Sequence, residues 1–207
     1  MSDTIFAKLR QKEKKNRKIA IVEVAEDILK NEGLESVTVR NVAQKAGLSS
    51  GAIYMYFKSK EELLLNMLIQ NLKVLRQDMS TSMDKNNPVE AIREMGYHYR
   101  HYFSRFGKYI NILGFAVKDD EKFKDLDSVM LDELEKVLAG LLSLVQEMLS
   151  AAPMNGLLKD LPPERGVPVL WALIQGLVQI TLPSPRSEIP AFDFDQIMDD
   201  VTHLLAY

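Results

Sequence analysis

Few residues in this sequence have both the type and the spacing that enzyme chemistry requires. His98 and His101 stand three positions apart, a spacing that suits two metal ligands on one helix, but no H-E-x-x-H pattern accompanies them. The chain contains no cysteine, which excludes disulfides, thiolate metal sites and a cysteine nucleophile. We therefore expect no catalytic residue, no metal site and no cofactor. The remaining enzyme alternative is a small helical enzyme that uses these histidines or acidic residues.

A second set of side chains suits a polyanion, and it lies between residues 38 and 60. Arg40 can donate a pair of hydrogen bonds to guanine, whereas tyrosine hydroxyls and Lys60 suit phosphate. Residues 1–62 carry 12 Lys/Arg against 9 Asp/Glu, and residues 63–207 carry 14 against 20. A basic N-terminal segment followed by an acidic remainder favours contact with nucleic acid. The alternative is a solvated N-terminal tail.

Two short helices joined by a tight turn would position these side chains. Thr38 can cap a helix that runs through Gln44, and Ser49 can cap another that runs to about Phe57. Gly47 suits a turn with positive φ, so the segment has the geometry of a helix-turn-helix. The small core expected between its helices comprises Val42, Ala43, Ala46, Leu48, Ile53 and Phe57.

The rest of the chain shows helical periodicity and no alternating strand pattern, which predicts an all-α fold of about nine helices. Cap residues and apolar spacing place the other helices at residues 16–32, 59–83, 87–106, 108–117, 128–151, 164–182 and 193–206, with Gly107 as a break. Residues 118–127, 152–163 and 183–192 are expected to be connections. There is no signal-peptide pattern and no apolar run of membrane-spanning length, so we expect a cytoplasmic protein with no membrane partner.

The segment TVRNVAQKAGLSSGAIYMYFKSKEELL resembles the DNA-binding domain of the TetR/AcrR family of repressors. The resemblance covers roughly residues 16–65 and includes the run Y-x-Y-F-x-S-K-E-E-L. It implies a three-helix DNA-binding domain, here residues 1–60 with a basic N-terminal arm. It also implies a larger helical ligand-binding and dimerisation domain, here residues 61–207.

The resemblance also implies roles for individual residues. Thr38 and Arg40 match positions that touch phosphate or base from the second helix. The matching positions at the start of the recognition helix, which meets base edges, are Ser49, Ser50, Gly51 and Ala52. The positions that usually contact phosphates are Tyr54, Tyr56 and Lys60. For either tyrosine the alternative is a packed core position.

An aromatic stripe in the second half suggests a regulatory site. Residues 97–109 hold six of the aromatic side chains, and the tyrosine hydroxyls among them could anchor an apolar or aromatic ligand. The candidate ligand-binding residues are Met95, Tyr99, Tyr102, Phe103, Met130, Leu134, Trp171 and Gln175. The alternative is a packed core with no ligand.

The last two helices are candidates for a homodimer interface. Residues 164–182 are apolar on nearly every side, and residues 193–206 carry a second apolar stripe, so two copies of each predict a four-helix bundle. The alternative is a helix covered by its own chain. Together these features predict a repressor that binds a palindromic double-stranded DNA operator as a homodimer and is released by a small hydrophobic ligand. The alternative function is a DNA-binding dimer with no ligand.

Overall fold

The structure is a computed structural model that describes residues 4–82, 84, 87–116, 126–151, 159, 161–182 and 192–206, without the side chains of 107–116, 151 and 206. These residues form eight α-helices and one short 3₁₀ helix, and no strand occurs among them. The chain divides into two compact units: unit 1 comprises residues 1–70 and 109–131, and unit 2 comprises residues 71–108 and 132–207. In the described part of the chain, no helix is long and apolar enough to cross a membrane.

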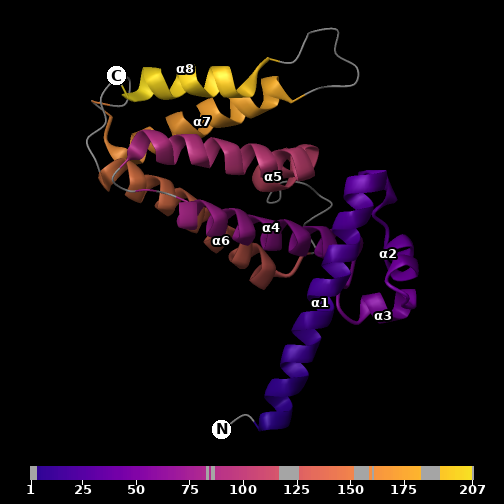
Figure 1. Cartoon of the computed structure of the whole chain (residues 1–207). Helices are drawn as coiled ribbons and strands as arrows, with labels where there is room; N and C mark the ends of the chain where they lie inside the picture. Colours follow the sequence, from indigo (N-terminus) through magenta and orange to yellow (C-terminus); the bar gives the residue numbers. More distant parts are fainter. Residues whose placement is uncertain are drawn as a thin grey trace. The chain divides into compact units, whose positions relative to one another are not determined.

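Unit 1 is built around the helix-turn-helix. Its elements are α1 (Ile5–Glu32), η1 (Leu34–Ser36), α2 (Val39–Lys45), α3 (Ser50–Tyr54), the first half of α4 (Lys60–Ser82) and the adjoining ends of α5 and α6. Figure 1 shows α2 and α3 beside α1, and contacts link α1 to α2 and α2 to α3. Fully buried Ile28, Val42, Ile53 and Phe57 form the core of this unit.

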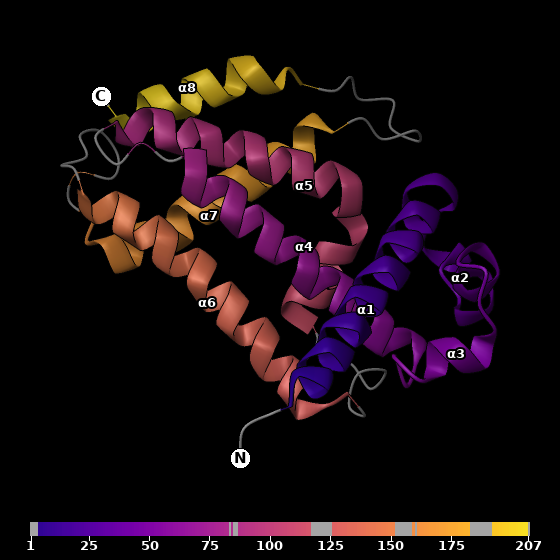
Figure 2. The same cartoon turned by 60° about the horizontal axis from the view of Figure 1, so that its bottom comes forward.

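Unit 2 contains most of α5 (Pro88–Ala116) and α6 (Ser128–Ala151), the second half of α4, and all of α7 (Pro163–Thr181) and α8 (Phe194–Ala206). Within this unit α8 lies along α5 and α7 in both views (Figures 1 and 2). Its core holds long apolar side chains from all five helices, among them Met79, Ile92, Leu141, Leu170 and Met198.

The helix termini follow the cap residues of the sequence. The backbone N–H of Glu62 donates to Ser59 Oγ at 3.1 Å, and the N–H of Glu90 donates to Asn87 Oδ1 at 3.2 Å. At the start of α8, the N–H of Gln196 donates to Asp193 Oδ1 at 3.0 Å. Each bond satisfies a backbone donor that the first helical turn leaves without a partner.

Two predicted boundaries are wrong. The predicted break at Gly107 does not occur, because α5 is one helix from Pro88 to Ala116. The described residues form eight α-helices, close to the predicted number of about nine. A glycine inside a helix costs only about 1 kcal/mol relative to alanine, and packing along a long apolar face outweighs that. The first helix begins at Ile5, not Asn16, so the basic N-terminal segment is helical. Of the predicted connections, residues 118–125, 152–158 and 183–191 lie outside the described residues.

Candidate DNA-binding and ligand sites

The turn between α2 and α3 is fixed by backbone geometry. Gly47 has φ of +67°, a conformation that other residues resist, and it lies two residues after the end of α2. The N–H of Leu48 donates to the carbonyl of Ala43 at 2.8 Å, which closes the turn. The predicted core is confirmed except at Leu48, whose side chain is exposed, and Ala46, which is only half-buried. Small Ala43 is buried where α2 meets its neighbours.

The two N-cap hydroxyls are used as acceptors. Thr38 Oγ1 accepts from the N–H of Asn41, and Ser49 Oγ accepts from the N–H of Ala52, each at 3.1 Å. A hydroxyl that accepts through its oxygen still has a proton to donate. Both residues are exposed, so their O–H groups can donate to phosphate oxygens while they hold the helix starts in place.

Among the other candidate DNA contacts, Arg40, Gly51 and Tyr54 are exposed, whereas Ser50, Ala52, Tyr56 and Lys60 are half-buried. The Tyr54 side chain is 54% exposed, which argues against the core alternative for this residue. Arg40 makes no hydrogen bond or ion pair with any described residue, so its guanidinium can donate to a partner outside the chain.

Helix α1 supports the recognition helix through two cations that the sequence did not single out. Hydrogen bonds to Tyr56 and then to Glu13 raise the pKa of Arg17 above its usual value, so this guanidinium stays charged. Lys18 Nζ lies 5.1 Å from the centre of the Phe57 ring, within cation–π range. The sequence does indicate that α1 extends into the basic segment, because residues 5–15 contain many strong helix formers and no glycine or proline.

A polar cluster ties the end of α1 to the start of α2. Glu32 forms an ion pair with Lys45 and accepts from Asn41 Nδ2 at 3.2 Å, and these two contacts, in that order, lower the pKa of its carboxyl. The same amide group donates to the carbonyl of Ser36 at 2.9 Å. Asn41 thereby fixes the angle at which α2 leaves the preceding turn.

Five aromatic residues of unit 2 form one cluster. The Tyr99 ring lies 4.8 Å from the Trp171 ring, 5.9 Å from Phe103 and 6.4 Å from Tyr102, measured between centres. Tyr102 extends the cluster to Phe106 at 5.4 Å. These distances are typical of aromatic pairs that stabilise each other by more than their buried area.

The hydroxyl of Tyr99 is the unusual atom of this cluster. Tyr99 is 2% exposed, and its hydroxyl oxygen has no hydrogen-bond partner among the described residues. Burial raises the pKa of this hydroxyl to about 12. An unsatisfied buried hydroxyl costs about 1–3 kcal/mol, so the described residues do not supply the polar partner that a purely structural core would have.

The remaining ligand candidates fall into two groups. Met95 and Leu134 are buried in unit 2, and Gln175 lies one turn beyond Trp171 on α7. Met130 is also buried but belongs to unit 1.

Each of the last two helices has one buried and one exposed face. On α7 the side chains of Leu170, Ile174 and Leu177 are buried by the chain itself. Ile180 and Leu204 are 52% and 59% exposed, and Leu173 is also exposed. A Cβ added at Gly176, on the exposed face of α7, would meet no described atom within 4 Å.

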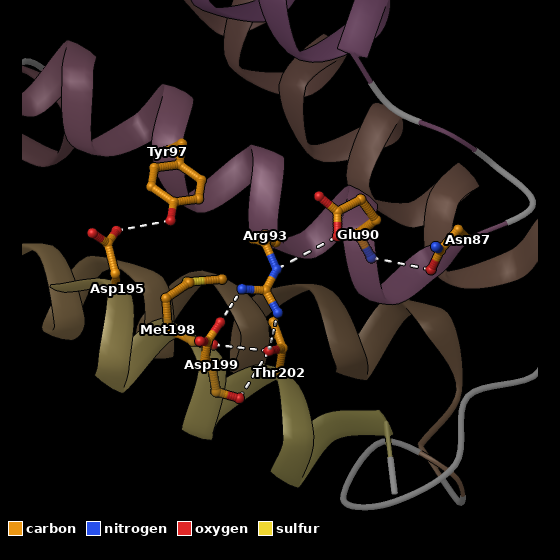
Figure 3. Close-up of polar contacts among 8 residues, drawn as sticks. All are labelled: Asn87, Glu90, Arg93, Tyr97, Asp195, Met198, Asp199 and Thr202. Carbon is orange, nitrogen blue, oxygen red and sulfur yellow. Dashed lines mark hydrogen bonds and ion pairs between the residues drawn. The ribbon is translucent and has the colours of Figure 1, made fainter.

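Polar contacts fix α8 against α5, as Figure 3 shows. Arg93 pairs with Asp199, and the Tyr97 hydroxyl donates to Asp195 Oδ1 at 2.7 Å. This hydrogen bond, with a smaller contribution from burial, raises the pKa of Tyr97. The helices approach closely at Gly96, where an added Cβ would lie 2.8 Å from Met198 Sδ. The exposed face of α8 is therefore presented by a well-anchored helix.

His98 and His101 do not share a partner. His98 Nε2 lies 2.9 Å from Ser82 Oγ and 3.8 Å from Glu94 Oε2, whereas His101 is exposed. No group of three potential metal ligands occurs among the described residues.

With this geometry described, comparison with known proteins identifies the DNA-binding part of the chain. The profile of the bacterial regulatory proteins of the tetR family matches residues 21–67. These residues form a TetR-family DNA-binding domain. The match spans the end of α1, the helix-turn-helix and the start of α4. Such a domain binds DNA in bacterial regulatory proteins, and the match supports transcriptional regulation as the general function.

Individual relatives extend the likeness to the rest of the TetR fold. The chain is similar to the HTH-type transcriptional regulator EthR of Mycobacterium tuberculosis, 35% identical over 79 residues that cover 38% of this chain and 36% of EthR. Its fold resembles the crystal structure of the regulator FadR from Bacillus subtilis in complex with stearoyl-CoA, with a TM-score of 0.61, 15% identity and coverage of 90% and 96% of the two chains.

A second solved structure gives the same picture. It is AibR in complex with isovaleryl coenzyme A and operator DNA, with a TM-score of 0.61 and 18% identity over 91% of this chain and 97% of AibR. At such identities the two structural likenesses show the fold alone.

Proposed function

We propose that this chain is a ligand-responsive repressor that binds a palindromic operator as a homodimer and leaves it when a small apolar ligand enters unit 2. The Tyr99 hydroxyl carries the ligand part of this proposal, because it is buried among aromatic rings without a hydrogen-bond partner in the described structure. The two TetR-fold structures described above hold acyl-CoA ligands, which supports an apolar chain as the ligand class.

The DNA-binding part rests on the exposed surface of α2 and α3. Thr38, Ser49 and Tyr54 present hydroxyls, and Arg40 presents an unpaired guanidinium, on the segment that the family profile matches. The recognition helix begins with small residues, so Ala52 is a candidate for apolar contact with a thymine methyl group. Phosphate contacts from Lys60 and from the basic half of α1 would add affinity that does not depend on sequence.

The dimer part rests on the exposed apolar faces of α7 and α8. Leu173, Ile180 and Leu204 are large apolar side chains that the chain itself leaves exposed. Gly176 lies on the same face of α7, where the absence of a side chain permits a partner helix to approach closely. A twofold dimer would present two recognition helices to successive major grooves, which predicts a palindromic operator.

Regulation requires a link between the two sites, and α4 is the proposed link. This helix begins six residues after α3 ends, and its residues belong to unit 1 up to Gln70 and to unit 2 from Asn71. A ligand that binds the released state more tightly than the DNA-bound state would shift the equilibrium between them. Residues 1–60 would then act as the DNA-binding domain and residues 61–207 as the regulatory domain, in the cytoplasm.

The test is an operator titration with and without candidate ligands. The operator is first selected from random duplexes with the purified protein, and its affinity is then measured with an acyl-CoA, with the matching free fatty acid, or with buffer alone. A coupling of about 1–3 kcal/mol predicts that the effective ligand weakens operator binding by about 5- to 150-fold.

Trp171 supplies the second readout, because it is the one tryptophan of the sequence and lies against Tyr99. Ligand entry should change its fluorescence at the same concentrations that release the operator. Ligands that change the fluorescence without changing operator affinity would contradict the proposed coupling. Operator binding with no responsive ligand would favour the alternative, a DNA-binding dimer without a ligand.

A further inference from the structure

A groove in unit 2 is lined by basic side chains, which the aromatic cluster lacks. It lies between the second half of α4 and the part of α6 that belongs to unit 2, and its volume is about 520 Å³. This volume falls within the range of about 300–1,000 Å³ that is typical of small-molecule sites. The lining residues are Lys73, Arg76, Gln77, Ser80, Glu133, Lys136, Val137 and Leu144.

The charges of the groove are unbalanced. Glu133 is the one carboxylate among the lining residues, and it is paired with Lys73. Arg76 and Lys136 are exposed and make no ion pair or hydrogen bond with any described residue. Two cations therefore face the groove without a counter-ion from the described part of the chain, although the sequence downstream of residue 62 is acidic overall.

Gly140 places one of these cations inside the groove. A Cβ at this position would lie 2.9 Å from Arg76 Nε and 3.1 Å from Arg76 Cζ, so the guanidinium rests on the bare backbone of α6. A larger residue at position 140 would push the guanidinium away from α6. Buried Val137 and the neighbouring Leu144 supply an apolar surface beside it.

We propose that this groove binds the phosphate groups of a phosphorylated organic anion that carries an apolar part, as a coenzyme A thioester does. An arginine fork donates paired hydrogen bonds to phosphate, a lysine adds a point charge, and Gln77 adds an amide donor. The apolar surface suits the uncharged portion of the same molecule. The inference rests on the proposed function, since it assigns a site to the polar part of the ligand proposed there.

The experiment measures coenzyme A binding to the full-length purified protein by isothermal titration calorimetry. Arg76→Gln should weaken binding by about five- to tenfold, the loss expected for charge-assisted hydrogen bonds in a partly exposed groove. The matched control is Arg165→Gln, which removes the same charge from an exposed position on α7 outside the groove and should bind as the wild type does.

Gly140→Ala distinguishes an effect on coenzyme A binding from an effect on protein stability. Alanine favours a helix over glycine, and the flexible end of Arg76 can move aside, so the melting temperature should not fall. Coenzyme A binding should nevertheless weaken, because the guanidinium loses its position on α6. Unchanged coenzyme A affinity in both Arg76→Gln and Gly140→Ala would overturn the inference. A loss of operator affinity in Arg76→Gln with unchanged coenzyme A affinity would overturn it in favour of a DNA contact.

Two further comparisons identify the source of the phosphate and separate this inference from the proposed function. Pyrophosphate that binds as tightly as coenzyme A would overturn the assignment to a phosphorylated organic ligand and leave a site for free phosphate. In another outcome, a free fatty acid releases the operator equally well from the wild type and from Arg76→Gln while neither protein binds coenzyme A. That result would support the proposed function and overturn the assignment of the groove as a phosphate site. Coenzyme A that binds through Arg76 without any acyl-CoA releasing the operator would support the groove and contradict the proposed function.

Discussion

The candidate DNA-binding residues and the aromatic cluster are held by different kinds of contact. In unit 1, Thr38 and Ser49 are fixed by bonds to backbone groups three residues further along the chain. In unit 2, Tyr99 contacts Trp171, which lies on a different helix. Local contacts can hold exposed side chains for a partner, whereas the aromatic cluster exists only when α5 and α7 are packed together. Substitutions of exposed side chains such as Arg40 should therefore change binding more than stability, and substitutions of buried side chains in unit 2 should do the reverse.

The largest expected effect concerns the two faces of α7. Leu177→Glu places a carboxylate where the chain buries the side chain to 4% exposure, so the fold should lose about 3 kcal/mol or more. Leu173→Glu places the same charge on the exposed face, so each chain should remain folded while the proposed dimer dissociates. Circular dichroism with urea measures the first effect, and analytical ultracentrifugation measures the second.

A folded Leu177→Glu protein with native stability would contradict the burial described for α7. A Leu173→Glu protein that remains dimeric would place the dimer interface elsewhere. Gly176→Ala gives a finer comparison on the same face: in the isolated chain it should stabilise α7 by about 1 kcal/mol, because nothing described lies within 4 Å. Weaker dimerisation in this variant would indicate a close helix contact between the two copies.

The second comparison tests whether operator affinity and protein stability depend on different residues of unit 1. Arg40→Ala should cost about 1–3 kcal/mol of operator affinity if the guanidinium reads a base, with little change in stability because the side chain has no partner in the described structure. Ser49→Ala removes a cap bond and should instead cost about 1 kcal/mol of stability. Fluorescence anisotropy with labelled operator and urea unfolding measure the two quantities.

The salt dependence of the same titration distinguishes a base contact from a phosphate contact. If Arg40 contacts a phosphate, Arg40→Ala should weaken binding to all sequences and reduce the salt slope by about one. If Arg40 reads a base, the slope should change little and specificity should relax at one position. Unchanged operator affinity at every salt concentration would remove Arg40 from the DNA-binding surface.

Local sequence signals were sufficient for the helix-turn-helix and for most helix starts. Ser59, Asn87 and Asp193 cap their helices through backbone bonds, and Gly47 adopts the positive φ that its position in the turn requires. These features depend on neighbours within about four residues, so their chemistry is visible in the sequence. The same is true of the buried aromatic stripe on α5, whose helical spacing predicted a shared face.

Features that depend on distant residues were not predictable in the same way. Gly107 is a helix breaker by local propensity, yet α5 continues past it. Leu177 is apolar on an apolar helix, and only the fold shows that it faces the chain's own core while Leu173 is exposed. The groove brings together Arg76 and Gly140 from separate helices, and neither residue suggests a phosphate site alone. Hydrophobic patterning identifies faces but does not say which element covers each one.

The smallest expected effect concerns the Tyr99 hydroxyl, whose removal should raise the stability of the protein and not lower it. Tyr99→Phe removes a buried hydroxyl that lacks a partner in the described structure, so the ligand-free protein should gain about 1 kcal/mol of stability at pH 7. The same change should weaken the response to ligand if the hydroxyl is the ligand's polar anchor. In the unfolded chain, Tyr99 loses its hydroxyl proton near pH 10. In the folded chain it keeps this proton to a higher pH, because burial raises the pKa of Tyr99 to about 12. Stability linked to Tyr99 is therefore present below about pH 10 and is lost as the pH rises toward 12. Urea unfolding at pH 7, 9.5 and 11 should show this loss in the wild type and in the control Tyr54→Phe, whose tyrosine is exposed, and a smaller loss in Tyr99→Phe. A destabilised Tyr99→Phe protein at pH 7 would show that the hydroxyl already has a partner in the folded protein, and the aromatic cluster would then be a packed core.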